Sequence, residues 1–189
     1  MQLSPRACIL IVAMVGGLAC NLARADQIFL KFLPGPAGEI LGDSTDAQHP
    51  GEIVVLSYSI GVEADTSWTK GSGASVGKPN PLDLQFTAAM NRSVPSILNY
   101  ITTGSASPMA ILTLRSDIPG NRAGFEYAKY TFEGVFFTSV GQSLAGPGRA
   151  VSAVSAVYKT VQVQQFAPGV PDAVSCVKWD VPAGLAVGC

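Results

Sequence analysis

The sequence predicts a mainly β protein, an antiparallel sandwich or barrel with one short α-helix. Several short segments alternate apolar and polar residues, which is the period of a half-buried strand. One segment switches to helical spacing. Turns rich in Gly and Pro separate the segments, and helices do not alternate with strands as a parallel sheet requires. With 189 residues, the chain is long enough for one domain with its own core.

Six strands are expected along the chain. They cover residues 27–33, 52–62, 82–88, 109–115, 125–140 and 151–166. In the second strand, apolar side chains at every second position are expected to share one face, opposite Ser57 and Ser59; they are Val54, Leu56, Tyr58 and Ile60. Residues 63–81 are rich in Gly, Ser, Thr and Pro. Because they exceed the length of a hairpin turn, we expect a long, mobile, protruding loop there.

The helical segment runs from Ser93 to Gly104. Its apolar residues fall at the spacing of one helical face, and they are Val94, Ile97, Leu98 and Ile101. Ser93 is expected to be the N-cap, Pro95 is tolerated in the first turn, and Gly104 is expected to end the helix. The sequence therefore predicts one helix of about three turns.

The first 25 residues have the layout of a secretory signal peptide. Arg6 precedes an apolar run over 7–19, and the small-x-small pattern Ala23-Arg24-Ala25 follows. The run is shorter than the ~20 residues of a membrane-spanning helix. We therefore expect cleavage after Ala25, export to the periplasm or the extracellular space, and no stable membrane insertion. Lipid attachment at Cys20 and an uncleaved anchor are the alternatives.

Cleavage would leave 10 basic and 13 acidic residues, a net charge of −3, because residues 1–25 contain two of the 12 basic residues and no acidic one. The chain lacks the basic face typical of nucleic-acid binding, so we expect no nucleic-acid partner.

Two cysteines remain in the mature chain, and the C-terminal segment predicts that they pair. Residues 181–184 (Val-Pro-Ala-Gly) are typical of a type I turn. A two-residue loop at Pro182-Ala183 sets Trp179 opposite Ala186 and Cys176 opposite Cys189, and opposed side chains point to the same side of a sheet. A disulfide is therefore expected in an oxidising compartment. The alternative is a bulge at Gly184, which would shift the register by one residue.

The block around residues 44–61 is the most specific motif of the chain. Ser44-Thr45-Asp46 is followed by His49 and Gly51, and then by Leu56-Ser57-Tyr58-Ser59-Ile60-Gly61. Further matches in the same order are Asp83–Thr87, Ser93–Gly104 and Ala110–Arg115. This series resembles the haemolysin-coregulated protein (Hcp) family over about residues 27–166. The resemblance implies a domain over 26–166, after a signal peptide over 1–25 and before a C-terminal hairpin extension over 167–189.

The resemblance implies an antiparallel two-sheet β-barrel with one helix, assembled into hexameric rings. In type VI secretion such rings stack into a tube, and small effectors and other secretion components are expected partners. A signal peptide and a tail after Phe166 depart from the family pattern. The expected function is therefore a non-enzymatic structural or secreted protein of the Hcp type. The alternative is a periplasmic or extracellular binding or adhesion module that reuses the barrel.

Motifs that would indicate an enzyme, a metal or a cofactor are weak. His49 is the single histidine, with Asp46 and Glu52 nearby, and we expect His49 and Asp46 to hydrogen-bond their own loop instead. The segment 70–78 superficially resembles a phosphate-binding loop, but its spacing is one residue short and Pro79 replaces the hydroxyl residue. The family resemblance makes it a ring-stacking loop, with Lys70, Gly71, Gly73, Gly77 and Lys78 as its contact residues. No catalytic residue, metal or cofactor is expected.

Overall fold

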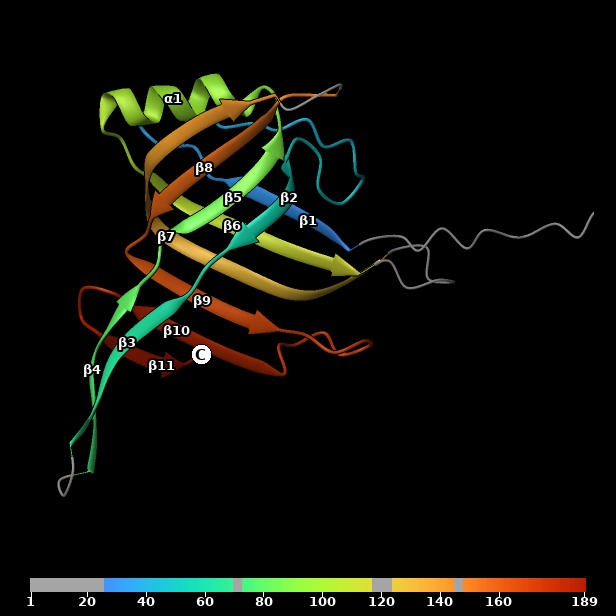
Figure 1. The fold of residues 1–189 in the computed structure, drawn as a ribbon. Coiled ribbons are helices and arrows are strands. Elements are labelled where there is room, and N and C mark those ends of the chain that lie inside the picture. The colour runs from blue at the N-terminus through green and yellow to red at the C-terminus, as the bar shows by residue number, and fades with distance from the viewer. Residues whose placement is uncertain (1–25, 70–72, 117–123, 145–147) are drawn as a thin grey trace, which may run out of the picture.

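Six antiparallel strands close into a barrel in the computed structural model, which describes residues 26–69, 73–116, 124–144 and 148–189 (Figure 1). The barrel strands are β1 (Gln27–Phe32), β2 (Ile53–Ser59), β5 (Leu84–Ala89), β6 (Ser107–Ser116), β7 (Phe125–Ser143) and β8 (Val151–Val157). Their order is β7-β6-β1-β2-β5-β8, and β8 returns to pair with the second half of β7. The predicted fold class, a mainly β barrel with one helix, is confirmed. The expected signal peptide lies outside the described residues.

A bend in β7 allows this strand to pair with two different strands along one edge. The first half of this 19-residue strand pairs with β9 (Thr160–Gln165), and the second half pairs with β8 along the same edge. The bend falls at Gly134, whose φ of 63° is costly for residues with a Cβ. A Cβ there would also lie 3.1 Å from the Cβ of Lys159. The single strand predicted over 151–166 is therefore wrong: two strands follow the bend, with a break before Thr160.

A β-bulge in β2 changes which side chains enter the core. The register against β5 shifts between Val55 and Ser57. Ile53 and Val55 are buried before the bulge, whereas Val54 and Leu56 are 44% and 58% exposed. After the bulge, Tyr58 and Ile60 pack against the core; the prediction that Val54, Leu56, Tyr58 and Ile60 share one face is therefore wrong.

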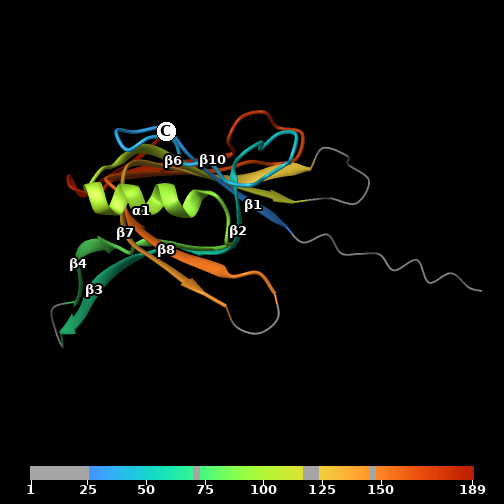
Figure 2. The ribbon, with the colours of Figure 1, turned by 90° about the horizontal axis from the view of Figure 1, so that it is seen from above.

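The single helix α1 (Ser93–Thr103) packs against β7 at one end of the barrel (Figure 2). Its N-cap is Arg92, and the side chain of Asn91 accepts the backbone N–H of Ser93 at 2.9 Å. The predicted Ser93 cap is thus wrong by one position, because Ser93 is already helical and buried. Gly104 ends the helix in the left-handed conformation, as predicted.

The buried face of the helix includes Tyr100 and excludes Leu98, which was expected on it. Leu98 is 51% exposed, whereas Tyr100 is buried and its ring lies 5.9 Å from that of Phe137, centroid to centroid. The Tyr100 hydroxyl donates to the carbonyl of Gly38 at 2.6 Å and accepts the N–H of Gly35 at 2.8 Å. This side chain therefore joins the helix to the loop after β1.

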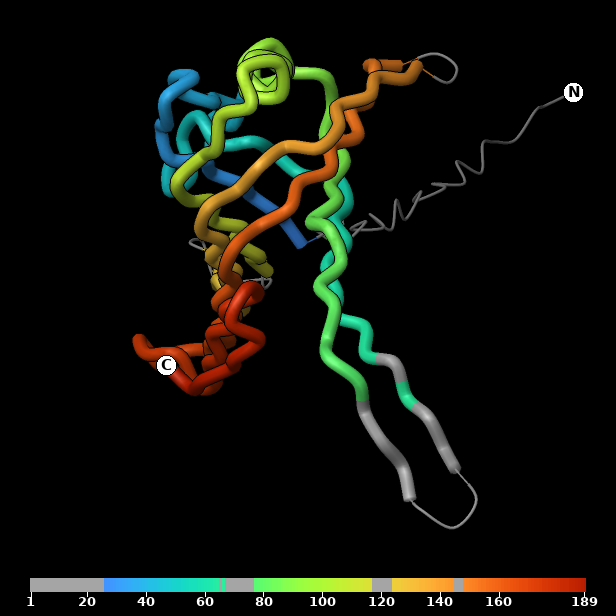
Figure 3. Tube along the Cα trace, turned by 90° about the vertical axis from the view of Figure 1, so that its left-hand side faces the viewer, coloured from blue at the N-terminus to red at the C-terminus, as the bar shows by residue number. Residues whose placement is uncertain are grey.

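A two-stranded arm projects from the barrel between β2 and β5 (Figure 3). It consists of β3 (Val62–Thr69) and β4 (Gly73–Pro81), which pair in an antiparallel ladder. The loop predicted over residues 63–81 is therefore wrong. The segment is rich in Gly, Ser and Pro, so its sequence has no clear strand pattern. Pro79 and Pro81 are tolerated because β4 is an edge strand.

The C-terminal segment extends the barrel sheet. β10 (Ser175–Asp180) pairs with β9, and β11 (Leu185–Gly188) pairs with β10 and forms the sheet edge. Trp179 lies opposite Ala186, which confirms the predicted register. Trp179 is also buried in the same core as the barrel residues, so the hairpin packs as part of one structure.

Candidate assembly surfaces

The motif loop before β2 is held by an ion pair with β6. Both carboxylate oxygens of Asp46 accept hydrogen bonds from the Arg115 guanidinium, at 3.0 and 2.6 Å. Oδ1 of Asp46 also accepts the backbone N–H groups of Gln48 and His49. The hydrogen bonds from Arg115 hold the pKa of the Asp46 carboxyl well below its usual range, against the opposing effect of burial. Arg115 also hydrogen-bonds the side chain of Gln27.

His49 is buried inside the same loop. Its ring stacks on Phe29 with 4.2 Å between centroids, and the Arg115 guanidinium lies 5.1 Å from the Phe29 centroid. Its Nδ1 lies 3.1 Å from a Glu52 carboxylate oxygen, and its Nε2 lies 3.4 Å from Glu126. Burial raises the pKa of Glu52, although the adjacent His49 opposes the shift. With an exposed fraction of only 5%, His49 packs and orients the loop rather than facing a substrate.

The other motif residues of this loop form its turns. Ser44 accepts the N–H of Gly51 at 2.8 Å through its carbonyl, and its side chain accepts the N–H of Asp46 at 3.2 Å. Gly51 has φ of 70°, a conformation that favours glycine. Thr45 is exposed at the loop surface. The sequence motif thus describes a tight, internally bonded loop.

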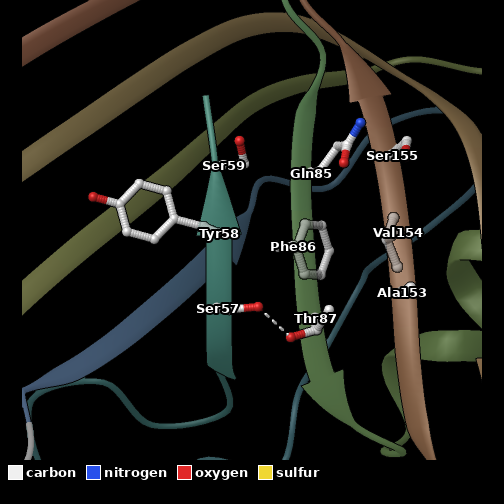
Figure 4. A pocket seen from close by; sticks show the side chains of 9 residues that line it. All are labelled: Ser57, Tyr58, Ser59, Gln85, Phe86, Thr87, Ala153, Val154 and Ser155. Carbon is white, nitrogen blue, oxygen red and sulfur yellow. Dashed lines mark hydrogen bonds between the residues drawn. The ribbon is translucent and has the colours of Figure 1, made fainter. Parts of the chain in front are cut away.

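The motif residues of β2 do not form one site. Ser57 and Ser59 point to one side of the strand, and Tyr58 points to the other (Figure 4). Ser57 and Ser59 are exposed on a shallow hollow of about 170 Å³ over β2, β5 and β8 (Figure 4). The hydroxyls of Ser57 and Thr87 are 2.6 Å apart. The lining residues are Ser57, Tyr58, Ser59, Gln85, Phe86, Thr87, Ala153, Val154 and Ser155, all of them uncharged.

Tyr58 points away from the two serines, and its ring lies 5.9 Å from that of Tyr130 (Figure 4). Burial, with a smaller contribution from Tyr130, raises the pKa of Tyr58 to about 12. Tyr58 therefore stays neutral, and its ring packs against the core while the residue also lines the hollow.

The predicted stacking residues lie on the arm, as far as they are described. Gly73, Gly77 and Lys78 belong to β4, and Gly77 and Lys78 are exposed. Lys70 and Gly71 lie outside the described residues. Lys78 reaches toward the C-terminal hairpin: its Cε would lie 3.6 Å from a Cβ added at Gly184.

The C-terminal hairpin is closed by a disulfide between Cys176 and Cys189, with 5.5 Å between the Cα atoms. The register that opposes Trp179 to Ala186 also opposes these two cysteines, as the sequence predicts. The bulge at Gly184 does not form: Gly184 instead closes the turn by donating its N–H to the carbonyl of Val181 at 3.2 Å. The Cys176–Cys189 disulfide joins Cys189 to β10.

The matching family model is described as "Type VI secretion system effector, Hcp", and it covers residues 29–165. This chain belongs to the Hcp family. Protein hcp1 of Pseudomonas aeruginosa is 33% identical to it over 152 residues, which cover 78% of this chain and 90% of that protein. The resemblance read from the motif block is therefore confirmed. The family consists of structural and secreted proteins of type VI secretion, and the binding or adhesion alternative is not favoured.

Solved Hcp structures share the fold of this chain. Hcp1 from Salmonella typhimurium is 28% identical with a TM-score of 0.69, covering 87% of this chain and 100% of that one. A structure described as that of a type six secretion system protein has a TM-score of 0.74, covering 86% of this chain and 100% of that one. At 21% identity, the latter shows the fold alone. Both matches cover a larger share of this chain than residues 29–165.

Sequence reasoning missed three residues that hold the Hcp motif loop: Gln27, Arg115 and Glu126. Arg115 was noted only as the end of a strand pattern, although a charge ending an otherwise apolar strand is a signal for a buried partner. Gln27 and Glu126 have no such signal, because both are polar residues at strand starts. Among the described residues, no group of three or more His, Cys, Asp or Glu side chains is arranged to hold a metal ion. Within the same residues, no helix is long and apolar enough to cross a membrane.

Proposed function

We propose that this Hcp-family chain is an exported, non-enzymatic subunit that assembles into hexameric rings. The observation that supports this best is the arm. Its two strands pair only with each other among the described residues, and they project away from the barrel (Figures 1 and 3). Val62 and Leu82 at its base are 55% and 40% exposed. An isolated two-stranded ribbon is marginal in water, so an arm of this length is expected to be covered in an assembly.

A structural role agrees with the state of the polar groups. Asp46, Arg115 and His49 are the conspicuous ionisable cluster of the described residues, and they are engaged in holding one loop. The surface hollow over β2, β5 and β8 offers serine and threonine hydroxyls and a glutamine amide, but its lining includes no acid, base or histidine that would activate them. These groups support binding and packing rather than catalysis.

The arm is the contact that we assign to ring stacking or to neighbouring subunits. Three of the five residues expected from the family belong to its strand β4, namely Gly73, Gly77 and Lys78, and Lys70 and Gly71 lie outside the described residues. The partners are thus other copies of this chain, with further type VI secretion components or small effectors as additional partners.

Export to the periplasm or the extracellular space is supported by two independent features. Residues 1–25 have the pattern of a signal peptide, and the disulfide at the chain end is typical of an oxidising compartment. Cleavage after Ala25 would leave Asp26 as the first residue. N-terminal sequencing of the exported protein tests this, and retention of Met1 or lipidation of Cys20 would contradict it.

The mass of the purified mature protein tests the assembly. Light scattering is expected to give a mass near six chains. Each contact between neighbouring subunits in such a ring needs a well-packed interface of more than ~1,000 Å². A protein that stays monomeric at high concentration would overturn the ring proposal, whatever the localisation.

A further inference from the structure

The edge strand β11 carries no charge, proline or bulge that would prevent pairing, and its one protection is its length of four residues. It lies at the open edge of the nine-stranded sheet, and its sequence is Leu-Ala-Val-Gly. Edge strands in soluble proteins usually present a charge, a proline or a bulge to prevent association. All four residues of β11 are exposed and uncharged, and its ladder with β10 is regular.

An apolar stripe lies beside this open edge. Leu185 and Val187 are 65% and 59% exposed. Because Ala186 lies opposite the buried Trp179, residues 185 and 187 point to the other side of the sheet, which is also the side of Cys176 and Cys189. The edge therefore presents two aliphatic side chains next to a disulfide.

The disulfide holds this edge in place. β11 pairs with β10 at four positions, and none of its side chains is buried. A four-residue strand whose side chains are all exposed frays readily. The Cys176–Cys189 bond closes the hairpin at the end opposite its turn, so β11 is fixed at both ends.

We propose that β11 is a docking edge for strand β3 of a second copy of this chain, and that the Cys176–Cys189 disulfide keeps the edge competent. This inference rests on the proposed ring and names where the arm of a neighbour binds.

The arm supplies a suitable partner strand. β3 has eight residues, enough to span the four of β11, and within the described part of the chain it pairs only with β4, which leaves its outer edge open to a partner. β4 is the poorer partner, since Pro79 and Pro81 lack the N–H that a ladder needs.

The geometry of such a contact agrees with a ring. β11 and β3 are different surfaces, so their contact is heterologous, and repeated heterologous contacts close a ring or grow a filament. Four residue pairs bury too little area for a stable interface alone. The edge therefore works as one part of a larger contact between neighbouring subunits.

Native mass spectrometry of two matched lysine variants tests the docking edge. Val187 and Val174 have almost the same exposure, 59% and 58%, but Val174 lies outside the strands. We expect Val187→Lys to raise the concentration needed for assembly on the order of tenfold, as loss of a central interface side chain does, and Val174→Lys to leave it unchanged. Reduction of the wild-type disulfide is expected to act like Val187→Lys, with the far-UV circular dichroism of the barrel still native.

Photo-cross-linking identifies the occupant. With the photoreactive residue p-benzoylphenylalanine at position 187, the cross-linked peptide is expected to contain residues from β3 of another copy. A hexamer that is unaffected by Val187→Lys overturns the docking edge but leaves the ring proposal intact. Cross-links from β11 to β11, or to a different protein, overturn the choice of occupant. A dimer that dissociates on Val187→Lys and cross-links to β3 supports the edge and overturns the hexamer, and a monomer overturns both.

Discussion

Asp46 and Arg115 form an ion pair across 69 residues of sequence, with a shortest N–O distance of 2.6 Å. The Arg115 side chain is almost fully buried and that of Asp46 is mostly buried. Through this pair, the motif loop before β2 is fixed to the end of β6, on the far side of β1. The pair is therefore the main electrostatic contact that positions the family motif.

Replacing Arg115 with Met should destabilise the protein by about 3 kcal/mol, because it leaves the Asp46 carboxylate, only 23% exposed, without its charged partner. The measurement is urea unfolding at neutral pH. Lys129→Met is the matched control: its ion pair with Glu126 is about one-third exposed, so a loss below ~1 kcal/mol is expected. Equal losses in the two variants would show that the Asp46–Arg115 pair has no special weight.

The same pair predicts a loss of stability in acid. The pKa of Asp46 is depressed in the folded state, mainly by hydrogen bonds from Arg115. Its contribution is therefore fully present above the carboxyl pKa of the unfolded chain, ~3.9, and is lost as the pH falls from there through the folded pKa. The free energy of unfolding of Asp46→Asn should differ from that of the wild type most at neutral pH and least near pH 2. A difference that is constant with pH would contradict this assignment.

Gly134 should not tolerate a side chain. Its φ of 63° and the nearby Lys159 Cβ make Gly134→Ala cost roughly 1–2 kcal/mol, because L residues are strained in the left-handed region. Gly141→Ala in the same strand is the control, since a Cβ there meets nothing within 4 Å. Thermal unfolding of both variants measures the difference. If both lose the same stability, the bend of β7 does not depend on the glycine.

Tyr100→Phe isolates the polar contacts between the helix and the loop after β1. The ring keeps its packing on Phe137, but the carbonyl of Gly38 and the N–H of Gly35 lose their hydroxyl partner. A loss of about 1–3 kcal/mol is expected for such buried groups. Tyr127→Phe is the control, because its hydroxyl contacts Asp26 at an exposed position. A Tyr100 variant as stable as the control would mean that water replaces both bonds.

The features that local sequence determines were predictable. The tight turn at residues 181–184 sets the register of the last hairpin, and this register brings Cys176 to Cys189. Gly104 ends the helix for an equally local reason, because glycine adopts the left-handed conformation without strain. The motif block at 44–61 identified the family before any contact was known.

The features that depend on distant partners were not predictable. The bulge in β2 arises from pairing with β5, so no pattern within β2 shows that Val55 and Tyr58 point to the same side. The arm has weak strand propensity, with Gly and Pro in β4, and it forms a ladder only because β3 lies opposite. Arg115 comes within hydrogen-bonding distance of Asp46 only after β6 has paired with β1.

Shortening the arm should separate folding from assembly. Glu63 lies opposite Asn80, so residues 64–79 can be replaced by an Asn-Gly turn that joins the two strands at the base of the arm. The arm is a separate two-stranded ribbon, and a shorter connection changes the closure free energy by less than ~1 kcal/mol. We therefore expect nearly unchanged thermal unfolding of the barrel but loss of the hexamer by light scattering. Loss of cooperative unfolding would place the arm in the core, and a persistent hexamer would exclude it from the subunit contact.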